Sequence, residues 1–104
     1  MKITTVGGQG TTLLVKVAGE VADPPDADSL YDAISTEVRQ GAFAVEVDLS
    51  DVEILTSVGI TALLKAKTEA AQRGCPLSLV AASPIVHRVL EVTRLLEHFG
   101  LEPG

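Results

Sequence analysis

The clearest pattern in the chain is a change of hydrophobic period between residues 45 and 67. Over 45–49 every second residue is apolar, which is typical of a strand with one buried face. Over 60–67 the apolar positions follow helical spacing instead, so a helix is predicted over 57–73 with Gly74 closing it in a left-handed conformation. A strand that leads directly into a helix places the intervening polar residues, Thr56 and Ser57, at the helix start.

The rest of the chain alternates between strand and helix signals. Further strands are expected over 2–6, 13–18 and 77–81, with the central one over 44–49, and further helices over 29–40 and from Pro84 toward Phe99. The glycine-rich segment 7–10 is interpreted as a hairpin turn, because no Gly-Lys-Ser/Thr follows it to form a phosphate-binding loop. Ser83 before Pro84 indicates a helix start, with the serine as the cap.

The segment 19–28 is predicted to be a loop, because consecutive prolines are excluded from a helix interior and from a central strand. Asp28 or Ser29 is then expected to cap the following helix. That helix is expected to bury Leu30, Ala33, Ile34 and Val38, and the third helix to bury Val86, Val89, Leu90 and either Leu95 or Leu96. The three aspartates of the loop lack the glycine and the bidentate glutamate of a calcium loop.

This order of elements predicts an α/β fold. We expect a single domain spanning 1–104, with a mixed sheet of about four to five strands and three main helices packed mainly on one face.

Composition excludes several classes of function. The net charge of −6 repels polyanions, and aromatic residues make up only 3% of the chain, so nucleic-acid binding is not expected. No apolar run has the length of a membrane span and the first residues do not form a signal peptide, so direct membrane insertion is not expected either. With the single Cys75 there is no internal disulfide, and the chain is predicted to be cytoplasmic.

The sequence shows no set of residues for catalysis. His87 and His98 have no further ligand at metal-binding spacing, and Ser57 lacks the Gly-x-Ser-x-Gly context of a hydrolase nucleophile. We therefore expect a protein that is not an enzyme, with no catalytic residue, no metal site and no cofactor.

Ser57 remains the best candidate for a functional residue. A hydroxyl at a helix start lies near free backbone N–H groups and the positive end of the helix dipole, which stabilise a phosphate or another anion. The alternative is that Ser57 is only an N-cap whose oxygen accepts from the amide of Gly59 or Ile60.

A series of motifs in order along the chain resembles the STAS domain of bacterial anti-sigma factor antagonists. The matching pieces are Gly19-Glu20, Asp48-Leu49-Ser50, Ser57-Val58-Gly59 and the stretch from Ser83-Pro84 to Thr93. The family motif Asp-Ser-Ser/Thr-Gly aligns its phosphorylated serine with Ser57, and Thr56 is the second choice for the modified residue.

The resemblance implies a binding protein that is switched by phosphorylation. Its partners would be an anti-sigma factor that is also a serine-protein kinase of histidine-kinase-like ATPase fold, and a serine phosphatase that reverses the modification. Binding of the kinase would release a sigma factor. The expected partner-binding residues are Glu20, Asp23, Thr56, Ser57, Val58, Gly59 and Thr61.

Four positions depart from the family pattern. Thr56 replaces the motif aspartate, Val58 replaces the second hydroxyl, Ala22 replaces an aspartate, and Arg94 replaces a glycine. The first two motivate an alternative, an accessory subunit of an ABC-type membrane transport complex without a phosphoswitch. A third hypothesis, nucleotide binding, rests only on the helix start at residue 57. The sequence leaves open whether two copies form a homodimer.

Overall fold

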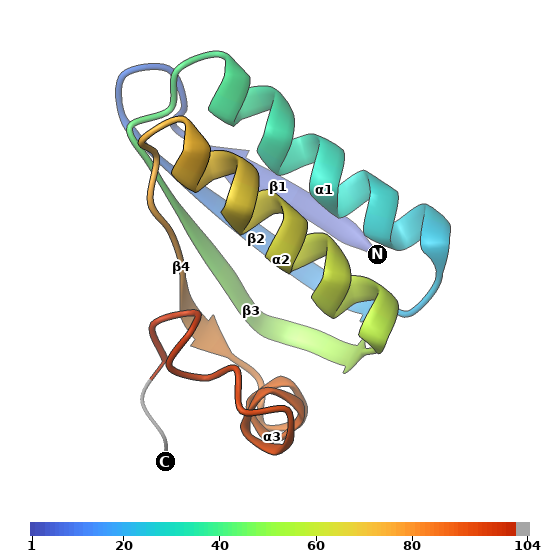
Figure 1. Cartoon of the computed structure of the whole chain (residues 1–104). Coiled ribbons are helices and arrows are strands. Elements are labelled where there is room, and N and C mark those ends of the chain that lie inside the picture. Colours follow the sequence, from blue (N-terminus) through green and yellow to red (C-terminus); the bar gives the residue numbers. More distant parts are fainter. Residues whose placement is uncertain (102–104) are drawn as a thin grey trace.

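The structure is a computed structural model that describes residues 1–101. Along this part of the chain strands and helices alternate in the predicted order (Figure 1). The elements are β1 (Lys2–Val6), β2 (Thr12–Val21), α1 (Pro24–Arg39), β3 (Ala44–Leu55), α2 (Ser57–Gln72), β4 (Leu77–Ala82) and α3 (Pro84–Val92).

The four strands form one mixed sheet in the order β1-β2-β3-β4. β1 and β2 are antiparallel and are joined by the glycine-rich segment, which confirms the predicted hairpin. Gly7 and Gly10 in this turn have φ values of 87° and 74°, a left-handed conformation that glycine adopts without steric cost. β2, β3 and β4 run parallel, so the carboxyl ends of these three strands lie at one edge of the sheet.

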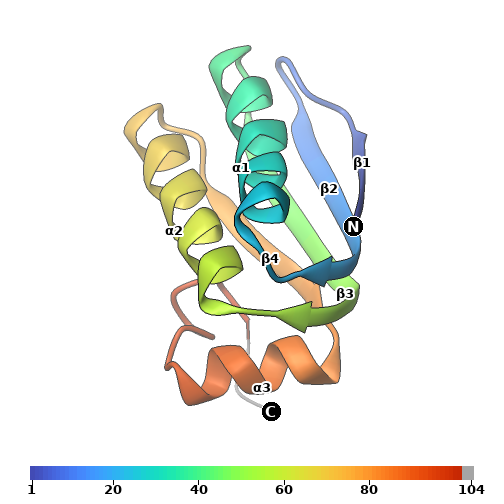
Figure 2. The ribbon, with the colours of Figure 1, turned by 90° about the vertical axis from the view of Figure 1, so that its right-hand side faces the viewer.

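Two helices cover one face of this sheet. α1 and α2 lie side by side over it, whereas α3 runs across the edge where β3 and β4 end (Figure 2). The core between the sheet and the two helices is built from Leu, Val, Ile and Ala, as the scarcity of aromatic residues predicts. The largest buried side chain is that of Phe99. The backbone carbonyl oxygen of Phe99 accepts a hydrogen bond from the amide of Leu79 in β4.

The predicted start of the first helix is wrong. α1 begins at Pro24, five residues earlier than expected, and neither Asp28 nor Ser29 caps it. Its cap is Asp23, whose carboxylate accepts the amide of Asp26 at 3.0 Å. Prolines fit the first turn because their missing N–H groups would have no partner inside the helix. Within α1, Ala33 is only half-buried, while the other expected core residues are buried.

The central strand is longer than predicted and the third helix is shorter. β3 continues past Leu49 to Leu55, and burial changes from every second residue to every third at Leu49, Val52 and Leu55. A register shift between β2 and β3 near Lys16 accompanies this change, so the alternation that indicates a strand is lost while the strand itself continues. α3 ends at Val92, and Leu96 rather than Leu95 is buried beyond it.

Candidate functional site

The candidate site lies where β3 ends and α2 begins. Leu55 is the last residue of the strand, Thr56 is the extended residue in the N-cap position, and Ser57 is the first residue of the helix. The amide of Ile60 donates to the carbonyl of Thr56 at 3.1 Å, which closes the first turn. The interpretation of Ser57 as an N-cap is therefore wrong by one position.

Thr56 occupies the cap position without capping the helix. Its side chain forms no hydrogen bond to the amides of α2, and its hydroxyl donates to the carbonyl of Ala22 at 3.1 Å. Its backbone amide donates to the carbonyl of Val21 at 3.1 Å. Thr56 thus ties the start of α2 to the end of β2, and its hydroxyl is half-buried and already engaged.

Ser57 differs from Thr56 in both exposure and hydrogen bonding. Its side chain is exposed, and its hydroxyl makes no hydrogen bond to any residue in 1–101. The first turn of α2 contains no acidic residue and receives no side-chain cap. Free amides and the helix dipole therefore remain available to an anion beside the Ser57 hydroxyl.

Gly59 sets the distance between α2 and the sheet. A Cβ atom on this residue would lie 2.7 Å from Cδ1 of Leu55, 2.7 Å from Cγ1 of Val21 and 3.1 Å from the carbonyl oxygen of Val21. Real Cβ atoms essentially never come as close as the two 2.7 Å contacts, so side chains or backbone would have to shift. The absence of a side chain thus allows the helix start to pack directly against β2 and β3, on the side away from solvent.

The other expected partner-binding residues lie around this helix start. Glu20 is exposed at the end of β2, beside Ile54 in the sheet register, and Asp23 is exposed in the cap of α1. Val58 and Thr61 are exposed on the first two turns of α2. The structure therefore gathers Glu20, Asp23, Thr56, Ser57, Val58 and Thr61 at one edge, with Gly59 buried beneath them.

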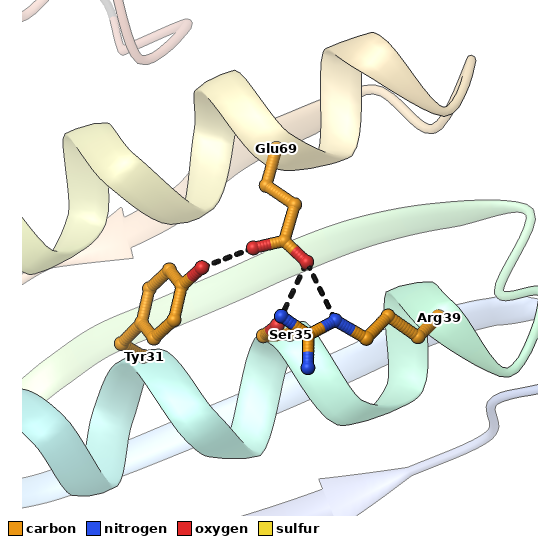
Figure 3. Close-up of polar contacts among 4 residues, drawn as sticks. All are labelled: Tyr31, Ser35, Arg39 and Glu69. Carbon is orange, nitrogen blue, oxygen red and sulfur yellow. Dashed lines mark hydrogen bonds and ion pairs between the residues drawn. The ribbon is translucent and has the colours of Figure 1, made fainter.

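Farther along the two helices, a polar cluster joins α1 to α2. Tyr31, Ser35 and Arg39 on one face of α1 all point to the carboxylate of Glu69 on α2 (Figure 3). The hydroxyl of Ser35 donates to Glu69 at 2.8 Å, Nε of Arg39 donates at 3.0 Å, and the hydroxyl of Tyr31 donates to the other carboxylate oxygen. These hydrogen bonds, above all that from Tyr31, hold the pKa of Glu69 below its ordinary value.

Replacing Glu69 by glutamine is expected to lower the melting temperature at neutral pH and to lose this effect in acid. Because the pKa of Glu69 is lower in the folded chain, its carboxylate stabilises the fold above the ordinary glutamate pKa of about 4.3. That contribution disappears as the pH falls through the lowered folded pKa. Circular dichroism melts of both proteins, from neutral pH down to about pH 3, measure the difference. A difference that stays constant over this range would contradict the assigned role of the carboxylate.

Residues considered for other chemistry lie apart from this site. Among residues 1–101 no three histidine, cysteine, aspartate or glutamate side chains come together in the manner of metal ligands. Cys75 is buried, and burial raises the pKa of its thiol, which disfavours the reactive thiolate. In the same part of the chain, every helix is too short or too polar to pass through a bilayer.

Comparison with known proteins identifies the fold family. The sequence model described as "Mlab, STAS domain" matches residues 4–101. The chain belongs to the STAS domain family. A search of curated protein sequences finds no significant match.

Solved structures with the same fold include those of anti-sigma factor antagonists. An anti-sigma factor antagonist from Mycobacterium paratuberculosis is 32% identical with a TM-score of 0.78, and the alignment covers 99% of this STAS domain and 87% of that chain. The anti-sigma factor antagonist SpoIIAA in its unphosphorylated form is 22% identical with a TM-score of 0.73, covering 90% and 82% of the two chains. The Bacillus cell fate determinant SpoIIAA in the phosphorylated form is 20% identical with a TM-score of 0.67, covering 90% and 85%.

Proposed function

We propose that this STAS domain is a cytoplasmic anti-sigma factor antagonist whose binding is switched by phosphorylation of Ser57. In this proposal the unmodified domain binds an anti-sigma factor of histidine-kinase-like ATPase fold and thereby releases a sigma factor. The same kinase transfers the γ-phosphoryl group of ATP to the Ser57 hydroxyl, and ADP and a proton are released. A serine phosphatase restores the free hydroxyl by hydrolysis.

The observation that carries this proposal is the difference between two adjacent hydroxyls. Ser57 is exposed and unbonded at an uncapped helix start, whereas the hydroxyl of Thr56 is half-buried and donates to Ala22. A kinase active site reaches the Ser57 hydroxyl without disturbing the fold. It reaches the Thr56 hydroxyl only by breaking the contact between the start of α2 and the end of β2.

The charges around Ser57 support a switch that works by repulsion. Phosphorylation adds about −1.5 to −2 charges at neutral pH. Glu20 and Asp23 nearby are already acidic, and the first basic residue of α2 is Lys65, two turns farther along. The first two turns of α2 therefore provide no side-chain counter-ion for the added charge, and a partner that covers it must desolvate it.

The antagonist from Mycobacterium paratuberculosis supports the choice of partner class, since it is 32% identical to this domain. Thr56 and Val58 still motivate the second candidate, an accessory subunit of an ABC-type transport complex that has no phosphoswitch. Genomic neighbours discriminate between the two. A gene for a histidine-kinase-like ATPase favours the antagonist, and a gene for an ABC permease favours the accessory subunit.

Phosphorylation by a cognate kinase tests the proposal directly. Incubation of the domain with candidate anti-sigma factor kinases and ATP is expected to add one phosphate, which peptide mass spectrometry assigns to Ser57 rather than Thr56. Ser57→Ala is expected to remain unmodified while it still binds the kinase. Modification of Thr56 instead, or persistent absence of any phosphate while binding is intact, would refute the switch at Ser57.

A further inference from the structure

A groove lies between the first turns of α1 and α2, beside the proposed phosphoacceptor. The two helices run next to each other over the sheet (Figure 2). Ala27 and Ala62, both nearly buried, form part of the groove lining, and Pro24, Val58 and Tyr31 also line it. The surface at this point is thus mainly apolar and concave.

The size of the groove indicates what it accepts. Its volume is about 260 Å³, below the roughly 300 to 1,000 Å³ that is typical of small-molecule sites. One large apolar side chain inserted by a protein fills such a space better than a cofactor does. Interface residues that carry most of a binding energy are side chains buried in pockets of this kind.

Two contacts of Tyr31 hold the far end of the groove. The ammonium group of Lys65 lies 5.2 Å from the centre of the Tyr31 ring, and the Tyr31 hydroxyl donates to Glu69. Contacts to its ring and to its hydroxyl group therefore hold Tyr31 in place, so the groove is already formed before a partner binds. Preformed pockets lose less conformational freedom on binding.

The edge of the groove near the start of α1 is acidic. Asp28 lines it and is exposed, and among residues 1–101 the only ion pair joins Arg39 to Glu69, so Asp28 has no cationic partner. An occupant with a basic side chain next to its apolar one complements Asp28 at this edge, and Lys65 lines the far end of the same groove.

We propose that this groove is the anchor pocket for the kinase-type partner, which inserts one apolar side chain between α1 and α2 and sets a basic side chain against Asp28. The inference rests on the proposed function. Val58 adjoins Ser57 and has 37% of its surface exposed, so a partner that covers Ser57 also covers the mouth of the groove. Val58 stands where the family motif has a hydroxyl, and it gives the groove an apolar wall that selects the partner.

Two threonines on α2 provide a matched test. Thr61 lines the groove and Thr68 lies two turns farther along, and both are exposed. Each hydroxyl donates to the carbonyl four residues earlier, at 2.9 Å for Thr61 and 3.0 Å for Thr68. Thr61→Phe fills the groove, while Thr68→Phe adds the same ring to the same helix outside it.

The measurement is calorimetric titration of the purified kinase that modifies Ser57 into each STAS variant, with thermal melts to verify folding. Thr61→Phe is expected to weaken binding at least about tenfold, Val58→Ser about fivefold, and Thr68→Phe less than about twofold. Unchanged affinity in Thr61→Phe or in Val58→Ser, or an equal loss in Thr68→Phe, would overturn the anchor pocket. No binding by the unchanged domain would instead refute the proposed function, and this inference with it.

Discussion

Ser57→Asp is expected to weaken the complex with the anti-sigma factor kinase by about 100-fold, which corresponds to about 2.7 kcal/mol. The carboxylate lies at an exposed helix start with acidic neighbours in Glu20 and Asp23 and no basic residue in the first two turns of α2, so the partner must cover and desolvate this charge. The free amides of α2 stabilise this charge in the folded domain by about 0.3 to 1 kcal/mol.

The matched control is Ser57→Asn, which has nearly the same shape as aspartate and no charge. Its affinity is expected to stay within about threefold of the unchanged domain, because a neutral amide requires much less desolvation. Titration of each variant with the kinase at low and high salt measures both affinities. Equal dissociation constants for the aspartate and asparagine variants would exclude repulsion as the mechanism, whatever happens to phosphorylation at this site.

A thermal melt separates this effect from a folding defect. An acidic residue in the first turn of a helix interacts favourably with the helix dipole. Ser57→Asp is therefore expected to melt at or slightly above the temperature of the unchanged domain while binding far more weakly. A lower melting temperature would mean that Ser57 contributes to stability in a way that its exposed, unbonded hydroxyl does not explain.

The order of the elements was predictable from the sequence, because each element with a buried face has apolar residues at a regular spacing. The start of α1 is not evident from the sequence, because consecutive prolines are excluded from a helix interior but fit the first turn, and the sequence alone does not distinguish these positions. The second half of β3 was missed because a change of register replaces the two-residue period after Leu49. Both errors arise where local signals compete with the way the chain packs.

The candidate site was predictable to within one residue, since the change of period between β3 and α2 locates the helix start. Which hydroxyl faces solvent was not predictable, because it depends on the carbonyl of Ala22, just after the end of β2, accepting a hydrogen bond from Thr56. The groove and the cluster around Glu69 were also not predictable, because both form only where α1 and α2 pack against each other. Tyr31, Ser35 and Arg39 repeat every four residues on α1, but only the relative placement of α1 and α2 brings Glu69 to them.

Gly59→Ala is expected to destabilise the STAS domain by about 1 to 2 kcal/mol, which lowers its melting temperature by about 5 to 10 °C. Alanine is the better helix former by up to about 1 kcal/mol, so propensity alone predicts the opposite sign. Packing decides the outcome, because the new methyl group would lie 2.7 Å from side-chain atoms of Val21 and Leu55 and 3.1 Å from a backbone oxygen. Val21 is fully buried and Leu55 nearly so, so neither has room to retreat.

Chemical denaturation of Gly59→Ala, Val21→Ala and the double variant measures the steric conflict between the new methyl group and Val21 as a coupling energy. The double variant is expected to lose about 1 kcal/mol less than the sum of the single losses, because shortening Val21 makes room for the new methyl group. Thr68→Ala, at an exposed position on the same helix, is the control and is expected to change stability by less than about 0.5 kcal/mol. Additive losses at residues 21 and 59 would contradict the close approach of α2 to the sheet. Since that approach fixes where Ser57 stands, Gly59→Ala is also expected to weaken kinase binding, although the Ser57 hydroxyl itself is retained.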